Sequence, residues 1–452
     1  MKKFMVMCAP FTSRSGYGAH ARDLFHAFYN TERFDIKLMD VRWGACPQNA
    51  LNKDNKKDKL ILDCILPMPP QIDKQPDIYV DIRIPNEFET HGKFNIGITA
   101  GVETTAVSEK WIEGCNKMDL VIVPSEHSKS GFVNSVYDKV QNLPDGKQEK
   151  IGELKLEKPM EVLFEGVDED IFKVIETSND KLYQFLDKKI KEDFNFLFVG
   201  QWVKGEFGED RKDVGRLIKV FYESFANQEN QPALILKTSG ATFSILDREE
   251  ILKKVRNIKN KFPSDFKLPN VYVLHGDLTD NEINLLYNHP KIKVMASFTH
   301  GEGFGRPLLE ATMVGLPVIA SNWSGQVDFL DQQLSVLIGG DLKNVPNSAV
   351  WKDIIIPESQ WFTIDENQAY RAIKYMYQNY DEVLQNTEKL MVENRNKFTL
   401  NKMTEKLDGI LEQYTKHIST QVQMKLPKLK KKTENKSKLK LPKLKKITEE
   451  IV

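Results

Sequence analysis

Residues 300–321 read His-Gly-Glu-Gly-Phe-Gly-Arg-Pro-Leu-Leu-Glu-Ala-Thr-Met-Val-Gly-Leu-Pro-Val-Ile-Ala-Ser. An apolar run ends at Ser297, just before this glycine-rich stretch, and residues 316–320 near its end are apolar again. Pro307 suits the first turn of a helix and Gly315 suits a helix end. The segment therefore predicts a strand, a glycine-rich loop, a helix and a second strand, which is the repeating unit of a parallel α/β sheet.

The same alternation extends outward in both directions. Apolar runs predict strands at residues 194–200, 233–237, 271–275 and 293–297, with helices at 214–226 and 249–261. Nearer the N-terminus, strands are predicted at residues 4–9, 35–40, 77–82, 95–99 and 120–124, with a helix at 19–30. The pattern predicts an α/β protein with two doubly wound, Rossmann-like domains and a cleft between the carboxyl ends of their strands.

Four segments follow from this pattern. We expect an N-terminal domain at residues 1–175, a second domain at 176–398, a closing helix at 399–418 and a separate tail at 419–452. Residues 366–397 and 403–417 have the spacing of amphipathic helices. Residues 141–150 are polar and contain glycine, which predicts a surface excursion.

Composition excludes several protein classes. Of 452 residues, 40% are hydrophobic and 28% charged, which rules out a chain that is disordered or fibrous throughout. The four cysteines have no CxxC spacing, so we expect free thiols in a reducing cytoplasm. Residues 4–10 follow two lysines but are too short for a secretory signal, and no window could span a bilayer. A cytoplasmic protein, free or peripheral at the inner membrane face, is expected.

The tail differs from the rest of the chain in charge. Residues 420–452 hold eleven Lys and three Glu, and Lys-Leu-Pro-Lys-Leu-Lys-Lys occurs at both 425–431 and 440–446. This composition predicts disorder. Three interpretations stay open: a solvated extension without function, association with an anionic membrane surface, or contact with nucleic acid. The last ranks third because the tail has no aromatic residue to stack on bases.

The glycine-rich segment is suited to binding a hydroxylated anion. Gly303 and Gly305 allow a ligand to approach the backbone, and the helix start after them offers free N–H groups. Glu302 and Glu310 can each accept hydrogen bonds from vicinal hydroxyls, as in a ribose or a hexose. The alternative is that Glu310 only complements the helix dipole and Glu302 is solvated.

The frame EGFG…PLLEA…GLPVIA, with Glu302 and Glu310 separated by seven residues, resembles the nucleotide-sugar signature of glycosyltransferase family four, the glycosyl transferases group one. The resemblance implies the GT-B fold and retaining transfer from a nucleotide-sugar donor. It also implies that Glu302 contacts the donor sugar and that Glu310 holds the ribose hydroxyls.

Residues 196–221 are similar to another segment of the same family. Lys212 stands five residues before Leu217, which is the position of the family's diphosphate-binding lysine. A fixed cation there would stabilise the leaving diphosphate in the transition state. Where the family commonly has an arginine, this chain has Gln201, so Arg211 or Lys204 is expected to substitute.

The N-terminal Gly16-Tyr-Gly-Ala-His-Ala21 matches G-x-G-x-x-A, and Asp40 follows Gly18 by 22 residues. This is the pattern of a dinucleotide site with its ribose acid. However, the seven residues 9–15 run from the last residue of the first predicted strand to Gly16, where that pattern needs an immediate turn. The family instead carries a glycine-rich loop here, near the donor phosphates and the acceptor. A plain turn into a helix is the third interpretation.

Two further motifs have ordinary explanations. Residues 165–168 resemble the family's NGVD segment, and they create Asp168-Glu-Asp170, which imitates a metal-binding DxD. We expect no metal there. Where many family members carry a histidine near the sugar, this chain offers only Glu103.

The sequence thus predicts a retaining glycosyltransferase that needs no metal and no cofactor and moves a sugar from a nucleotide-sugar donor to an acceptor hydroxyl. The acceptor is left open among glycan, lipid, protein and small molecule. The alternatives are an NAD(P)-dependent oxidoreductase and a non-catalytic scaffold that acts through its tail. The expected catalytic residues are Glu302, Lys212 and Arg211. The expected donor-binding residues are Glu310, Gly303, Phe304, Gly305, Gly16, Gly18, Lys237 and His300.

Overall fold

A computed structural model describes residues 2–143, 147–203, 205, 207–240 and 242–418. Residues Met1–Thr420 form one compact unit that contains two large sheets. The domain boundaries at residues 175 and 398 stay predictions. The predictions made for Lys204 and for residues 419–452 lie outside the described residues.

The first sheet has six parallel strands in the order β2-β1-β3-β4-β5-β8. The strands are β1 (Lys3–Ala9), β2 (Phe34–Asp40), β3 (Ile78–Ile82), β4 (Phe94–Ile98), β5 (Leu120–Val123) and β8 (Met160–Val162). The helices of this half are α1 (Gly16–Asn30), α2 (Lys56–Cys64), η1 (Pro85–Glu87), α3 (Glu109–Lys117) and α4 (Glu126–Asn134). Five of the strands overlap the apolar runs that predicted them, because a strand covered on both faces is apolar throughout.

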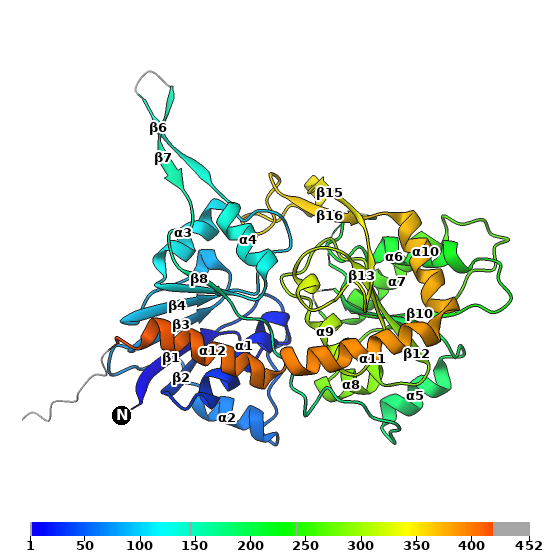
Figure 1. The fold of residues 1–452 in the computed structure, drawn as a ribbon, viewed down its shortest axis with the longest axis horizontal. Helices are drawn as coiled ribbons and strands as arrows, with labels where there is room; N and C mark the ends of the chain where they lie inside the picture. Colours follow the sequence, from blue (N-terminus) through cyan, green and yellow to red (C-terminus); the bar gives the residue numbers. More distant parts are fainter. Residues whose placement is uncertain (1, 144–146, 204, 206, 241, 419–452) are drawn as a thin grey trace, which may run out of the picture. The chain divides into compact units, whose positions relative to one another are not determined.

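The second sheet also has six parallel strands, in the order β11-β10-β9-β12-β13-β14. The strands are β9 (Asn195–Gln201), β10 (Ala233–Ser239), β11 (Val271–Leu274), β12 (Ile292–Ser297), β13 (Val318–Ser321) and β14 (Val336–Ile338). The helices of this half are α5 (Lys181–Lys189), α6 (Val214–Phe225), α7 (Ile245–Lys259), α8 (Asp280–Tyr287), α9 (Arg306–Met313), η2 (Gly325–Asp328), α10 (Glu366–Gln378) and α11 (Tyr380–Lys397). Figure 1 shows the two sheets with helices around each. We call the two halves the first and the second lobe.

Two small antiparallel sheets complete the strands. They are β6 (Tyr137–Asn142) with β7 (Gln148–Leu154), and β15 (Gly340–Asn344) with β16 (Gln360–Ile364), the latter enclosing η3 (Asn347–Ala349). The β6–β7 hairpin projects from the first lobe (Figure 1). The surface excursion predicted at 141–150 overlaps the two strands of this hairpin, whose backbones pair while most side chains of β7 stay exposed.

The predicted helix at 366–397 is two helices. Asn379 leaves the helical region with φ −119° and ψ 35°, and it separates α10 from α11. The chain then returns to the first lobe as α12 (Leu400–Thr415), seen in orange-red beside α1 in Figure 1. There Met403 and Leu407 join the core that contains Leu24 and Phe28.

The chain passes between the two lobes twice, near Val167 and near Thr399, and these two segments are hydrogen-bonded to each other. The Val167 N–H donates to the Phe398 carbonyl at 3.0 Å, and the Leu400 N–H donates to the Val167 carbonyl at 2.9 Å. The two segments that join the lobes therefore run side by side. No helix in the described part of the chain is both long and apolar enough to cross a membrane.

Candidate active site

The site lies where the strand order reverses in each sheet. β1 is flanked by β2 and β3, and β9 is flanked by β10 and β12, so the chain leaves these central strands toward opposite sides. Loops at the carboxyl ends of strands diverge at such points and leave room for a ligand. The loops concerned are 10–15 after β1, 202–213 after β9 and 298–305 after β12.

Gly305 sets the entry into α9. It is the N-cap residue with φ 102° and ψ 41°, a left-handed conformation in which a side chain would be strained. Pro307 sits in the first turn, as predicted, and Gly315 ends the segment with φ 74°. The loop thus delivers Glu302 just before the helix start, where unpaired N–H groups favour an anion.

Two cations converge on Glu302 from the β9–α6 loop. Lys212 Nζ is ion-paired with Glu302 Oε1, and Arg211 Nη1 lies 3.6 Å from Glu302 Oε2. Lys212 and Glu302 are buried, with 9% and 7% of their surfaces exposed. The structure therefore brings together the three residues that were expected to be catalytic, although 90 residues separate Lys212 from Glu302.

These charges control the protonation of the pair. Burial alone would raise the pKa of Glu302, but the Lys212 and Arg211 charges hold that pKa below its ordinary value. Burial lowers the pKa of Lys212, against the opposing effect of Glu302. An ion pair of carboxylate and ammonium, with a guanidinium beside it, is the resulting state.

Arg211 also reaches the first lobe. Its Nη1 lies 3.3 Å from Oε1 of Glu103, the residue that stands where a histidine was sought. Arg211 thus lies between one carboxylate from each lobe. This contact places Glu103 at the edge of the same site.

Glu310 lies one helical turn into α9 and is bound on both oxygens. Arg306 Nε donates to Oε1 at 2.8 Å, and the Tyr287 hydroxyl donates to Oε2 at 3.2 Å. Burial raises the pKa of Glu310 to about 7, although Arg306 opposes the shift. A carboxylate has about four acceptor positions, so two remain for a ligand.

The glycine loop touches the first lobe directly. The Gly303 carbonyl accepts a hydrogen bond from Ser125 Oγ at 2.6 Å and another from Ser128 Oγ at 3.3 Å. A Cβ at Gly303 would lie 1.9 Å from the Ala100 carbonyl oxygen. Only glycine permits this approach. Ser125 also caps α4, because its side chain accepts the Ser128 N–H.

The N-terminal glycines behave differently from each other. A Cβ at Gly18 would lie 2.4 Å from the Ser13 carbonyl oxygen, whereas nothing lies within 4 Å of one at Gly16. Asp40 accepts from Thr12 through both oxygens, from the backbone N–H at 3.0 Å and from the hydroxyl at 2.6 Å. The acid of the supposed dinucleotide pattern therefore anchors its own loop.

Three further expected donor contacts occupy supporting positions. The ring nitrogens of His300 face the carbonyls of Phe362 at 2.6 Å and Gly208 at 3.0 Å, and the ring stacks on Trp361. The Phe304 side chain is buried, so only its backbone can meet a ligand. Lys237 Nζ donates to the Gly276 carbonyl at 2.8 Å, and burial lowers its pKa.

The acidic pair after residue 165 faces a lysine. Lys57 Nζ is ion-paired with Asp168 and lies 3.4 Å from Asp170 Oδ2. Asp168 and Asp170, which resemble a metal-binding DxD motif, are therefore paired with a lysine side chain from α2. Across the described ranges, no group of three or more His, Cys, Asp or Glu is arranged to hold a metal ion.

Sequence reasoning missed the polar groups between the lobes. Arg306 is ion-paired with Asp23 of α1 as well as with Glu310. Glu165 is buried among the charges of Arg306, Asp23 and Glu310, and burial raises its pKa to about 7. In the sequence, Glu165 differs from the family's NGVD segment, which has asparagine at this position. That difference was the one indication that the position is unusual.

The match to a protein family decides the assignment. Residues 188–337 match the family described as Glycosyl transferases group 1. The chain carries a glycosyl transferases group 1 domain. This protein is a glycosyltransferase, and the match spans the β9–α6 and β12–α9 loops that hold Lys212 and Glu302.

Solved structures resemble this glycosyltransferase over almost its whole length. HepE from Anabaena, in complex with UDP and glucose, shares 11% identity over 91% of this chain and 100% of its own, with a TM-score of 0.56. Sucrose-phosphate synthase from Thermosynechococcus elongatus shares 12% over 91% and 99%, with a TM-score of 0.60. Alpha,alpha-trehalose 6-phosphate synthase from Burkholderia multivorans shares 10% over 91% and 99%, with a TM-score of 0.57.

These likenesses confirm the GT-B fold of the glycosyltransferase. No curated protein sequence matches the chain.

Proposed function

We propose that the protein transfers a hexose from a UDP-sugar to an acceptor hydroxyl, retaining the anomeric configuration and using no metal. The observation that carries the proposal is the convergence of Lys212 and Arg211 on Glu302 at the start of α9. A site for a departing diphosphate needs fixed positive charge beside a helix N-terminus, and this arrangement supplies both.

In this mechanism the bond between the sugar C1 and the diphosphate breaks as a bond to the acceptor oxygen forms on the same face. The leaving diphosphate oxygen takes the proton of the acceptor hydroxyl. Lys212 and Arg211 stabilise the negative charge that develops on the diphosphate, and they need no reorganisation because Glu302 already holds them in place. Glu302 accepts from the sugar hydroxyls and orients the ring.

Glu310 holds the ribose. Its two remaining acceptor positions suit the vicinal 2′- and 3′-hydroxyls, while Arg306 and Tyr287 fix the direction of the carboxylate. The Gly16–Gly18 turn at the start of α1 faces the acceptor side. Gly16 has open space around it, which leaves its backbone free to meet a ligand.

The choice of uridine is supported by similar structures. HepE from Anabaena was solved with UDP and glucose and also with UDP-glucose. The fold, the glycine loop and the paired carboxylates are consistent with the same class of donor here.

A thermal-shift screen of the purified protein against UDP, GDP, ADP, NAD and NADP tests the donor site. UDP should raise the melting temperature through its binding to the folded state, and Glu310→Ala should abolish the shift. A shift with GDP or ADP alone would change the base but keep the reaction class. A shift with NAD or NADP alone would contradict the proposal and favour the oxidoreductase alternative.

Release of UDP from UDP-glucose then tests catalysis. The rate should be unchanged by EDTA, because the proposed charge stabilisation comes from Lys212 and Arg211. A loss of activity that Mg²⁺ or Mn²⁺ restores would contradict the metal-free mechanism. Equal turnover in wild type and Glu302→Gln would contradict the role given to Glu302 and favour the scaffold alternative.

A further inference from the structure

His300 is buried where three segments of the chain meet. Only 1% of its surface is exposed, and it stands two residues before Glu302. Its backbone N–H donates to the Arg211 carbonyl at 2.9 Å, and its own carbonyl accepts the Phe362 N–H at 3.0 Å. His300 therefore joins the glycine loop to the β9–α6 loop and to β16.

Both ring nitrogens of His300 face backbone carbonyls. Nδ1 lies 2.6 Å from the Phe362 oxygen, and Nε2 lies 3.0 Å from the Gly208 oxygen. A carbonyl oxygen accepts hydrogen bonds and cannot donate one. A neutral imidazole carries a proton on one nitrogen alone, so its other nitrogen would direct a lone pair at a carbonyl lone pair. The two contacts therefore require a proton on each nitrogen, which makes the ring an imidazolium.

The neighbours of this ring suit a positive charge. Asp213 Oδ2 lies 3.6 Å from Nε2, and the Asp213 side chain is fully buried. Arg216 Nε lies 2.5 Å from the same oxygen, and Arg216 Nη1 lies 2.7 Å from Glu366, so two carboxylates face these two cations. The Trp361 indole stacks on the His300 ring with centroids 4.2 Å apart and planes 8° from parallel. An aromatic face attracts a cation in this position.

His289 shows the opposite pattern in the same lobe. It is also 1% exposed, but its Nδ1 accepts the Lys291 N–H at 3.3 Å, and its Nε2 has no hydrogen-bond partner within the described residues. These contacts fit a neutral ring, and burial lowers the pKa of His289. The charge of a buried histidine in this protein is thus decided by its contacts and not by burial alone.

The contacts of His300 hold the two loops that carry the expected catalytic residues. The carbonyls of Gly208 and Arg211 belong to the β9–α6 loop, which also carries Lys212. His300 binds that loop at both points, while its own backbone leads directly toward Glu302. A shift of either loop would separate Lys212 from Glu302.

We propose that His300 is held as an imidazolium and acts as a positioning residue, which keeps the Lys212 loop against the Glu302 loop while the donor reacts. The proposal rests on the proposed transferase function and adds a residue that acts through Lys212 and Glu302. Charge-assisted hydrogen bonds are about twice as strong as neutral ones, so a charged ring holds both carbonyls more firmly. Trp361 and Phe362 support the ring from β16, which lies outside the residues 188–337 that match the family.

NMR of the full-length protein with ¹⁵N-labelled histidine tests the charge. At pH 8, where a free histidine is neutral, the wild type should show both His300 nitrogens protonated. His289 should show one unprotonated nitrogen under the same conditions. The signals lost in His300→Gln and in His289→Gln assign the two rings. An unprotonated nitrogen on His300 at pH 8 would overturn the proposal, and the state itself is measured on the wild type.

Turnover of UDP-glucose tests the positioning role. His300→Gln should lower kcat by about 10–100-fold, because displaced catalytic groups cost most in the transition state. The Kd for UDP should stay within about threefold, because the contacts that fix Glu310 do not involve His300. His289→Gln should change neither value. An equal loss of kcat and of UDP affinity in His300→Gln would indicate a general structural role and would overturn the proposal.

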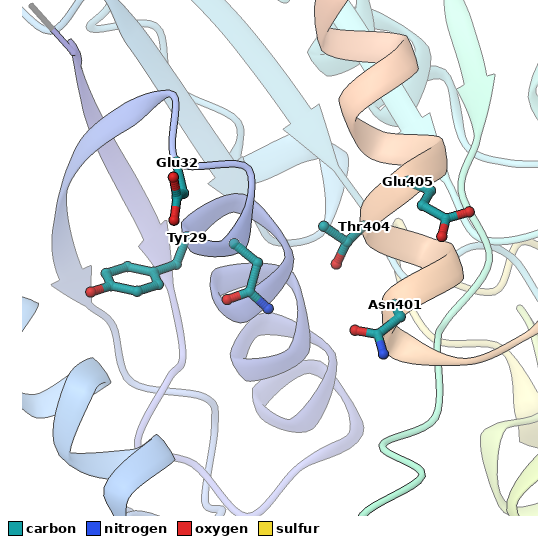
Figure 2. A pocket seen from close by; sticks show the side chains of 6 residues that line it. Tyr29, Glu32, Asn401, Thr404 and Glu405 are labelled. Atoms are coloured by element: carbon teal, nitrogen blue, oxygen red, sulfur yellow. The ribbon is translucent and has the colours of Figure 1, made fainter.

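A control for the loss of a side-chain hydrogen bond lies in the first lobe. Thr404 Oγ1 donates to the Leu400 carbonyl at 2.9 Å and lines a cavity of about 540 Å³ between the end of α1 and the start of α12 (Figure 2). The other residues labelled there are Tyr29, Glu32, Asn401 and Glu405. Within the described part of the chain, none of them is bonded to Lys212 or Glu302, so Thr404→Val should leave kcat within about twofold.

Two further outcomes decide the proposal. An unchanged kcat in His300→Gln, or an equal loss in Thr404→Val, would overturn it. Failure of the transferase function itself is distinguishable, because the wild type would then release no UDP from UDP-glucose while NMR would still report the state of the His300 ring.

Discussion

The two lobes each lead a glycine-containing loop into a helix, but only one of the loops collects charge. In the first lobe, Asp40 holds Thr12, and Arg22 Nη1 donates to the carbonyls of Phe11 and Ser13. Asp40 and Arg22 thus hold the loop after β1 in its conformation. In the second lobe, two cations from a neighbouring loop meet Glu302.

The difference shows why glycine spacing alone is weak evidence for a phosphate site. Glycine allows close approach, but a binding site for a diphosphate also needs cations that no structural partner has fully neutralised. In the second lobe, Lys212 and Arg211 both face Glu302, and Arg211 also faces Glu103 of the first lobe. In the first lobe, Arg22 donates to backbone carbonyls of its own loop.

The largest expected effect is on the charged loop. Lys212→Ala should lower the rate of UDP-glucose turnover by about 10²–10³, because a preorganised charge is lost from the transition state. Steady-state kinetics will measure it. Lys219→Ala is the control, since Lys219 lies on α6, the helix that follows the Lys212 loop, and is ion-paired with Glu366 of α10 away from the site. Equal activity of the Lys212→Ala and Lys219→Ala variants would contradict the role given to the charged loop of the second lobe.

Gly303 and Gly16 should differ in how much stability the same substitution costs. Gly303→Ala places a Cβ 1.9 Å from a carbonyl oxygen of the other lobe and should destabilise the protein by about 1–3 kcal/mol. Gly16→Ala meets nothing within 4 Å and should change stability by less than about 0.5 kcal/mol. Denaturant unfolding measures both values, and similar losses would show that the first loop is packed as tightly as the second.

Donor affinity should depend on pH through Glu310. Its carboxylate form accepts both ribose hydroxyls, and its pKa of about 7 means that this form is lost as the pH falls through 7. UDP-glucose should bind about tenfold more weakly at pH 6 than at pH 8. Calorimetry at both pH values tests this.

Two variants separate Glu310 from its neighbour. Glu310→Gln should flatten the pH dependence, whereas Glu165→Gln should keep it, although the pKa of Glu165 is also raised to about 7. A flat profile in Glu165→Gln would assign the titration to that residue instead.

The smallest expected effect concerns the first loop. Asp40→Asn keeps an acceptor for Thr12 but loses the charge, and it should cost about 0.5–1.5 kcal/mol of stability. UDP binding should stay within twofold. A lower affinity for NAD in Asp40→Asn than in the wild type would favour the interpretation of this loop as a dinucleotide site.

Much of the fold was predictable because buried parallel strands are apolar along their length. Runs such as residues 194–200 therefore identified their strands to within one residue, while β8, with only Met160–Val162, was too short to be recognised. The β6–β7 hairpin was missed because its pairing depends on backbone groups, and its side chains carry no apolar alternation.

The charged site was predictable where residues fell within a motif. Lys212, Glu302 and Glu310 were predicted in this way, and the structure brings Lys212 onto Glu302; their roles toward the donor stay predictions. Arg306 with Asp23, and Ser324 under strain, were not, because their contacts join segments that are far apart in sequence. His300 was predicted as a donor contact because it stands beside the motif. In the structure, both of its ring nitrogens face backbone carbonyls of the protein.

The paired crossing at Val167 and Leu400 has a consequence for synthesis on the ribosome. The first lobe is translated first, yet Met403, Leu407, Ile410 and Leu411 belong to its core. At about 5–20 residues per second, roughly 12–50 seconds pass between completion of β8 and arrival of α12. During that interval we expect the apolar side chains of α1 that α12 covers in the folded protein to stay exposed, and exposed apolar surface of this kind favours chaperone binding.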